Sequence, residues 1–268
     1  MKDLATFPDI ASASGPGGAA SAGAGHWWWR YASPQHVYPL AGRLWPVFAA
    51  LAVLLTGIGL YIGFFVAPTD HQQGDAYRII YLHVPAAWLA MLIYVAMAFW
   101  SAVGLVLGTR LSFMMARALA PTGALFSVLT LWTGALWGRP TWGTWWVWDA
   151  RLTSVVILLF LYIGFIALQA AIDDPRKGDK AGALLALVGA VNVPIIYFSV
   201  QWWNTLHQGS SINLKGSSMA SVMLAGMLVT TLGLWSYAIA AVLARLRVIV
   251  LARERHADWV ARLPEVKA

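Results

Sequence analysis

The stretch from Trp137 to Leu152 has the residue types to bind a flat, acidic ligand. It holds five tryptophans, interleaved with glycines and flanked by arginines. Large, rigid indoles stack on planar π systems, and an arginine beside them can pair with a carboxylate. A porphyrin with its propionates is such a ligand. A tryptophan belt at a membrane surface is the competing explanation, but it does not account for so many indoles in so short a stretch.

The predicted binding loop spans residues 137–152. It comprises Trp137, Gly138, Arg139, Trp142, Gly143, Thr144, Trp145, Trp146, Trp148, Asp149 and Arg151. If the middle of the loop is helical, the i, i+3, i+4, i+7 spacing from Trp142 to Asp149 puts three indoles on one face. That face would be a broad platform. Either Arg139 or Arg151 could pair with a carboxylate, and the sequence does not choose between them.

Two histidines have the surroundings expected of metal ligands. His83 lies two residues before Pro85, which suits the first turn of a helix, and His207 follows a tryptophan pair. The chain has no cysteine, so it has neither a disulfide nor a thiolate ligand. Imidazole is a common axial ligand of haem iron, and a pair of histidines is then the natural arrangement. A lone surface histidine is more often an ordinary polar residue, which is our interpretation of His71.

Uncharged apolar runs must position these residues. The chain is 60% hydrophobic and only 11% charged. Each run is about 20 residues long, enough to cross a bilayer core of about 30 Å as a helix. Unbroken runs without alternation exclude a β-barrel. The predicted fold class is an all-α, polytopic integral membrane protein with six transmembrane helices, near Pro46–Val66, Val84–Leu107, Ala118–Trp137, Ser154–Ile172, Gly182–Ser199 and Met219–Leu243.

The distribution of basic residues predicts the orientation. Both tails and the second and fourth connections carry 14 of the 18 lysines and arginines. The other side carries only Arg78, Arg139, Arg151 and Lys215. By the positive-inside rule both termini are cytoplasmic, and the binding loop, His83 and His207 lie outside. The same topology explains the net charge of +7, and no nucleic-acid motif accompanies it.

Three regions follow from this topology. Residues 1–45 are predicted to be a largely disordered cytoplasmic extension, with a Gly/Ala/Ser tract at Ala11–Gly25 and an interfacial aromatic anchor at His26–Arg30. Residues 46–243 form the membrane domain. Residues 244–268 form a basic amphipathic tail that suits a helix on anionic membrane lipid, or alternatively a docking surface for a cytoplasmic partner.

The loop sequence also resembles a known family. Trp-Gly-Thr-Trp-Trp-Val-Trp-Asp-Ala-Arg-Leu-Thr at 142–153 resembles the signature of the haem-handling WWD proteins. The segments at 82–88 and 202–209 are similar to those of its six-span branch, cytochrome c maturation protein C, and the likeness covers roughly residues 40–245. The long N-terminus departs from that pattern without touching a predicted site residue.

The resemblance carries its own implications. It implies that His83 and His207 are the axial ligands of a non-covalent, b-type haem and that the Trp-rich loop contacts it. It implies a subunit in the bacterial inner membrane that loads a periplasmic haem chaperone, CcmE, during c-type cytochrome assembly. The implied further partners are the ABC transporter subunits CcmA and CcmB and the small membrane protein CcmD.

Two alternatives stay open at this stage. A secondary transporter normally has an ionisable residue within a span, and the six apolar runs have none, with Asn192 and Pro194 as their one notable break. A haem lyase of the same superfamily is generally larger and has additional histidines.

No Gly-x-x-x-x-Gly-Lys-Ser/Thr loop or catalytic constellation occurs, so we expect a subunit that is not an enzyme and relies on a partner for energy.

Overall fold

The computed structural model confirms six helices that are long and apolar enough to cross a membrane. It describes residues 33–203, 205–207, 212–213 and 216–263. The predicted disordered tract at Ala11–Gly25 and the aromatic anchor at His26–Arg30 lie outside the described residues. The elements are α1 (Pro34–Tyr61), η2 (Ile62–Val66), η3 (Asp75–Ile79), α2 (Ile80–Leu107), α3 (Arg110–Trp142), α4 (Ala150–Ala171), α5 (Pro175–Gly189), α6 (Asn192–Trp202), β1 (Ile212–Asn213), β2 (Gly216–Ser217), α7 (Ser221–Arg253) and α8 (Asp258–Ala261).

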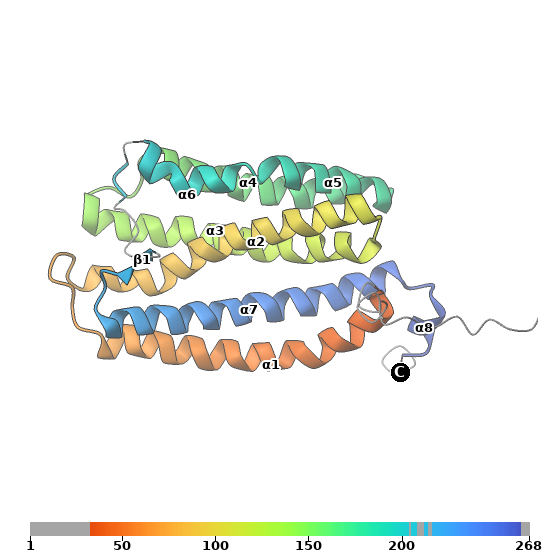
Figure 1. Cartoon of the computed structure of the whole chain (residues 1–268), viewed down its shortest axis with the longest axis horizontal. Coiled ribbons are helices and arrows are strands. Elements are labelled where there is room, and N and C mark those ends of the chain that lie inside the picture. Colours follow the sequence, from red (N-terminus) through yellow and green to blue (C-terminus); the bar gives the residue numbers. More distant parts are fainter. Residues whose placement is uncertain (1–32, 204, 208–211, 214–215, 264–268) are drawn as a thin grey trace, which may run out of the picture.

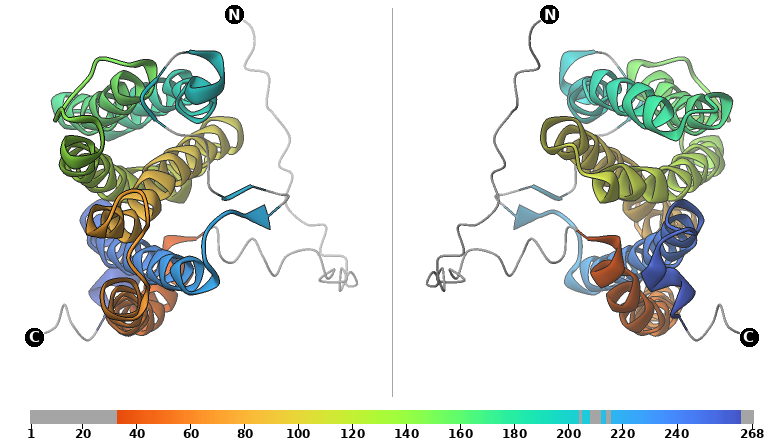
Figure 2. Two further views of the ribbon diagram at one scale, coloured as in Figure 1. Left: turned by 90° about the vertical axis from the view of Figure 1, so that its left-hand side faces the viewer. Right: turned by 90° about the vertical axis from the view of Figure 1, so that its right-hand side faces the viewer.

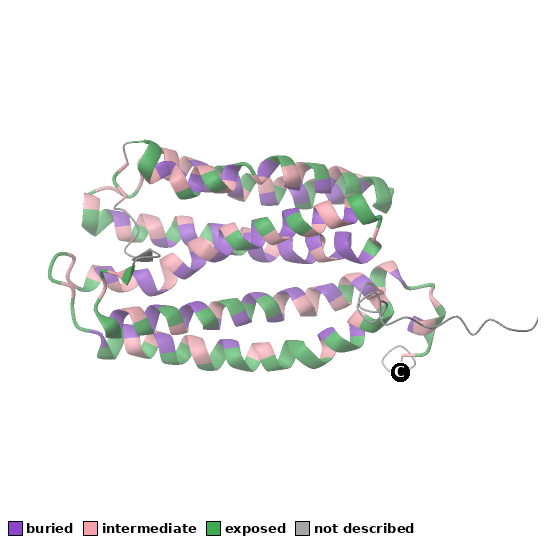
Figure 3. Cartoon of the chain, in the orientation of Figure 1, coloured by how far each residue is buried: buried purple, intermediate pink, exposed green. Residues whose placement is uncertain are grey.

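The long helices lie side by side in three layers (Figures 1 and 2). One layer holds α1 and α7, the next α2 and α3, and the last α4 with α5 and α6. Figure 3 shows buried residues concentrated in the middle layer, whereas α1 is exposed along most of its length. We refer to the end of the bundle where α3 ends and α4 begins as the site end.

Several helices extend beyond the apolar runs that predicted them. The first helix begins at Pro34 rather than near Pro46, and α7 continues through Arg253. The first half of the predicted tail is therefore an extension of the sixth span, and a separate turn forms only in α8. An ion pair fixes the end of this extension against α5, because Arg253 donates two hydrogen bonds to the buried Asp179, at 2.9 and 3.1 Å.

The fifth span is broken where the sequence indicated. It consists of α5 and α6, separated at residues 190–191. The Asn192 side chain is buried and donates to the Ser154 carbonyl of α4 at 2.8 Å. A polar side chain in such a place needs a partner, and this bond anchors the start of α6 against α4.

An arginine fixes the corner that leads into α2. Arg78, in η3, donates to the carbonyls of Gly63 at 2.6 Å and Ala67 at 3.2 Å, and it pairs with Asp75 at 2.9 Å. These carbonyls belong to the π-helical end of the first span and the residue that follows it, where the regular backbone ladder stops. The start of α2 is thereby tied to the end of α1.

Two tyrosines and a phenylalanine fill the middle of the bundle below the site end. Tyr94 and Tyr162 are fully buried with their rings edge to face at 5.0 Å, and Phe126 is 1% exposed. The Tyr162 hydroxyl donates to the Ala90 carbonyl at 2.8 Å. The absence of a side chain at Gly123 leaves the space that the Tyr162 ring occupies. We refer to Tyr94, Tyr162 and Phe126 as the aromatic floor.

Glycines allow α1 and α7 to pack closely. A Cβ at Gly59 would collide with the backbone of Thr230, and one at Gly233 would collide with the backbone of Thr56. Small residues of this kind let membrane helices approach and gain packing energy that the lipid does not supply.

Replacing Gly59 tests this packing. We expect Gly59→Ala to lower the free energy of unfolding by about 1–3 kcal/mol, because the added methyl overlaps backbone that cannot rotate away. Gly57→Ala is the matched control, since a Cβ there meets nothing within 4 Å. Thermal unfolding in one detergent compares the two. Equal melting temperatures would show that α1 and α7 do not pack at Gly59.

Candidate functional site

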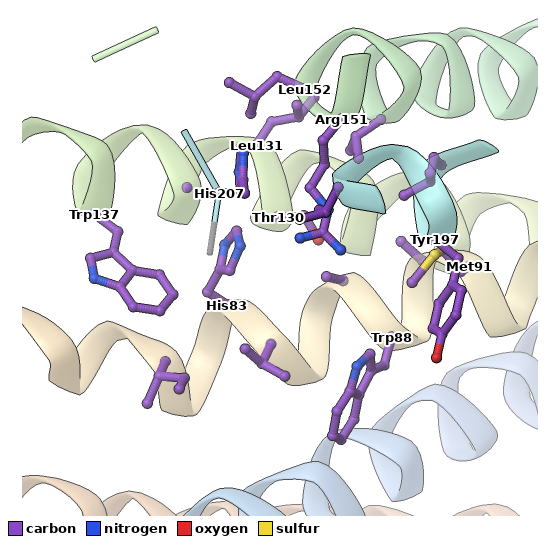
Figure 4. A pocket seen from close by; sticks show the side chains of 18 of the residues that line it. His83, Trp88, Met91, Thr130, Leu131, Trp137, Arg151, Leu152, Tyr197 and His207 are labelled. Atoms are coloured by element: carbon purple, nitrogen blue, oxygen red, sulfur yellow. The ribbon is translucent and has the colours of Figure 1, made fainter. Parts of the chain in front are cut away.

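A cavity of about 260 Å³ lies at the site end. Its walls come from α2, α3, α4 and α6, with Met219 and Met227 from the α7 side. Both predicted histidine ligands line it, and Figure 4 shows their rings close together, with Arg151 pointing into the same space. The polar groups converge at one part of a mostly apolar chamber, as is typical of a binding site for an organic ligand.

His83 is held in one tautomer by α3. Its Nδ1 lies 3.0 Å from the Thr133 hydroxyl, which itself donates to the Leu129 carbonyl at 2.6 Å. Because the hydroxyl proton is used there, the Thr133 oxygen must accept the proton on His83 Nδ1. Nε2 then keeps its lone pair. The ring also packs edge-on against Trp137, at 5.6 Å between centroids.

His207 is held through a carboxylate. Its Nδ1 lies 3.0 Å from Asp149 Oδ2, and the Thr205 hydroxyl donates to that same oxygen. An ionised carboxylate only accepts, so Nδ1 carries the proton and Nε2 is again unprotonated. The ring packs against Trp142 at 4.7 Å. A histidine backed by a carboxylate is the arrangement that orients many metal ligands.

The charge states of this pair follow from its surroundings. Burial lowers the pKa of His207 below its ordinary value, although Asp149 acts in the opposite direction. Burial alone would raise the pKa of Asp149, but hydrogen bonds from Thr205, the Leu152 N–H and His207 bring it below its ordinary value. At neutral pH the pair is therefore a carboxylate and a neutral imidazole, which is the form that ligates metal.

The two arginines that the sequence left open are placed differently. Arg151, in the first turn of α4, lines the cavity, and within the described part of the chain it makes no hydrogen bond or ion pair. Arg139, near the end of α3, is exposed and donates to the Gly143 carbonyl. Only Arg151 is thus available to an acidic ligand inside the cavity.

The predicted tryptophan platform is wrong. The helix α3 ends at Trp142 because Gly143 adopts a left-handed conformation, with φ of 78°, and residues 143–149 are not helical. Asp149 instead caps the start of α4, accepting the Leu152 N–H at 2.7 Å. The residues from 142 to 149 therefore share no helix face.

The predicted loop residues separate into two groups. Two indoles, Trp137 and Trp142, line the cavity. Trp145 and Trp148 are 55% and 76% exposed, and Trp146 packs edge-on against Trp148. The remaining residues shape the connection: Gly138 lies buried against it, and Thr144 bonds to the Trp146 carbonyl at 3.1 Å.

Sequence reasoning missed several cavity residues. Thr133 orients His83, and Gln73 accepts from the Trp137 indole at 2.8 Å. Trp88, Met91 and Tyr197 also line the cavity. One signal was available, since residues 130, 134, 137 and 141 of α3 line the cavity at helical spacing. The contributions of the other elements depend on tertiary packing.

The chemistry of the donor set limits the ligand. The described residues contain no group of three or more histidine, aspartate or glutamate side chains that could hold a metal ion. Two imidazoles with unprotonated Nε2 atoms suffice only when the remaining donors arrive with the metal, as they do in a metalloporphyrin. The mostly apolar lining of the cavity and the Arg151 guanidinium fit such a ligand and its carboxylates.

Comparison with known proteins gives one consistent result. The family model described as heme exporter protein C matches residues 27–261. The chain is 44% identical to heme exporter protein C of Haemophilus influenzae over 240 residues, which cover 89% of this chain and 98% of that protein. It is 45% identical to the Escherichia coli K12 protein of the same name, over 87% of this chain and 94% of that protein. A putative cytochrome c biosynthesis ccmC-like mitochondrial protein of Marchantia polymorpha is 49% identical, over 63% of this chain and 72% of that protein.

Replacing the Asp149 carboxylate tests its place in the site. We expect Asp149→Ala to cost about 0.5–2 kcal/mol for the lost helix cap, and about 1–3 kcal/mol more because Thr205 and His207 lose their acceptor. Asp174→Ala is the matched control, since Asp174 caps α5 but is exposed. Thermal unfolding in detergent measures both. Equal losses would mean that Asp149 acts only as a cap.

Proposed function

The chain belongs to the heme exporter protein C family, and from this premise we propose that it binds haem between His83 and His207 and passes it on for c-type cytochrome assembly. The observation that carries the proposal is that the two imidazoles have the same protonation pattern. Each has its Nδ1 proton bound by the chain itself and an unprotonated Nε2 beside one cavity. The bound group is a b-type haem with two histidine ligands.

The absence of cysteine fits this proposal. Covalent attachment of haem in c-type cytochromes uses cysteine thiols, and this chain has none. Haem here is cargo, supplying the iron and the flat macrocycle. The chain supplies two axial nitrogens, an apolar chamber, and a guanidinium at Arg151 for a propionate.

The same contacts suit transfer of the cargo. Coordination by imidazole, apolar packing and an arginine–carboxylate pair are separate, reversible interactions, so an acceptor can replace them one at a time. Trp145 and Trp148 are exposed next to the cavity and offer an apolar surface to that acceptor. We assign the acceptor as the periplasmic haem chaperone CcmE, which sets the site at the outer face of the inner membrane with both chain termini cytoplasmic.

The energy for the cycle comes from partners in this proposal. The chain has no phosphate-binding loop of its own, so it acts as a non-enzymatic subunit with the ABC transporter subunits CcmA and CcmB and with CcmD. The paired carboxylates and arginines at the end opposite the site, such as Asp179 with Arg253, stabilise the bundle on the cytoplasmic side.

Absorption spectra test the ligand assignment. We expect the purified protein to take up haem with the spectrum of a low-spin, bis-histidine centre. His83→Ala and His207→Ala should each lose that spectrum, because one axial position is then left without its imidazole. His71→Ala is the control, since His71 is exposed and does not itself line the cavity. An unchanged bis-histidine spectrum in both site variants would contradict the assignment.

A second experiment tests the propionate partner. We expect Arg151→Gln to weaken haem binding by about 10- to 100-fold, the value of a hydrogen bond to a charged group in a buried site. Arg139→Gln should leave the affinity unchanged because Arg139 is exposed. Haem dimethyl ester has no free carboxylate, so wild type and Arg151→Gln should bind this ester with equal affinity. A loss that persists with the ester would assign Arg151 a different role.

A further inference from the structure

The cavity is closed toward the middle of the bundle. Ala90 and Leu158 form part of its lining, and the aromatic floor begins there. Leu158 is fully buried, and the Ala90 carbonyl holds the Tyr162 hydroxyl. Beyond them Tyr94, Tyr162 and Phe126 leave no exposed surface above 1%. A planar macrocycle therefore has no passage along the bundle axis.

The cavity is open to the side instead. On α6 the lining residue Tyr197 is 59% exposed, and Gln201, one turn further, is also exposed. Trp88 and Met91 of α2, and Met219 just before α7, are half-buried. Figure 2 shows α6 and α7 in different layers with α2 between them, and Figure 4 shows Tyr197, Met91 and Trp88 together at one side of the cavity. We refer to Trp88, Met91 and Tyr197 as the side opening.

The chemistry of the side opening differs from that of the ligating groups. Its residues are two aromatic rings and a thioether, and methionine adapts its shape to flat apolar surfaces. The two histidines and the arginine that line the cavity, His83, His207 and Arg151, lie toward the site end. The chamber is thus polar toward the membrane surface and apolar toward the lipid.

We propose that haem enters and leaves through the side opening, at the depth of one membrane leaflet, rather than along the bundle axis or through the connection 143–149. This inference rests on the proposed function. Haem in a bilayer lies with its macrocycle among the acyl chains and its carboxylates at the headgroups. A lateral path brings it to the histidines in that same orientation, so its propionates reach Arg151 without crossing apolar surface.

A bulky label at the side opening tests the route. The chain has no cysteine, so single-cysteine variants can be labelled cleanly. We would label Tyr197→Cys with a bulky maleimide in nanodiscs, add hemin, and follow uptake by Soret absorbance in stopped flow. Release to excess apomyoglobin is measured on protein labelled after loading. Val188→Cys is the matched control, because Val188 of α5 is 73% exposed and lines no part of the cavity.

The expected result is kinetic. Relative to unlabelled Tyr197→Cys, the labelled protein should take up and release haem at least about tenfold more slowly, by the same factor in each direction and with the bis-histidine spectrum retained, because a barrier on the path slows both directions equally. Labelled Val188→Cys should match its unlabelled form. If unlabelled Tyr197→Cys does not fold, labelled Met91→Cys should give the same kinetic result, because Met91 of α2 lies beside Tyr197 at the opening.

Other outcomes overturn the inference. Unchanged rates in labelled protein would assign the route to the loop or another face. A weaker affinity with an unchanged uptake rate would make Tyr197 a contact residue and not part of a path. Either result, with a bis-histidine spectrum in wild type, overturns the side opening and leaves the proposed function standing. Wild type without that spectrum overturns both.

Discussion

The carboxylate of Asp149 joins the parts on which the site depends. It caps the start of α4 through the Leu152 N–H, and it accepts hydrogen bonds from Thr205 and His207 in the connection after α6. A partly buried negative charge is stable only when it has such donors. His207 lies outside any helix, so these bonds fix the place of its ring. The orientation of the His207 ring is therefore coupled to the beginning of a membrane span.

The second predicted ligand, His83, is positioned by different means. His83 lies in a long helix whose start is tied by Arg78 to the end of the first span, and its ring is oriented by the Thr133 hydroxyl of α3. Gly134 leaves room for the ring, since a Cβ there would lie 3.0 Å from His83 Cε1. The two imidazoles thus differ in their chemical surroundings. A carboxylate behind an imidazole increases its basicity more than a hydroxyl does, so in the proposed site His207 is the stronger donor of the two.

The sequence predicted those parts of the fold that are determined by whether a segment lies in lipid or in water. Uncharged runs had to become membrane helices, and the break near Asn192 was visible because a polar residue and a proline interrupt an apolar run. Helix ends were less accessible, because an ion pair such as Asp179 with Arg253 forms only after packing. The loop conformation was predicted wrongly, since the left-handed turn at Gly143 outweighs the helical spacing of the indoles. Thr133 carries no local signal, because its role exists only opposite His83.

Trp145 and Trp148 have a consequence for how the protein sits in its surroundings. Exposed indoles favour the boundary between acyl chains and water, where the ring is among lipid and the N–H is hydrated. They belong to the short segment that ends in Asp149, so the level they adopt also fixes the level of His207, which is bonded to Asp149. The position of these indoles at the lipid–water boundary thus sets the depth of the site in the bilayer. A change in membrane thickness would move the lipid past the cavity while the protein itself kept its shape.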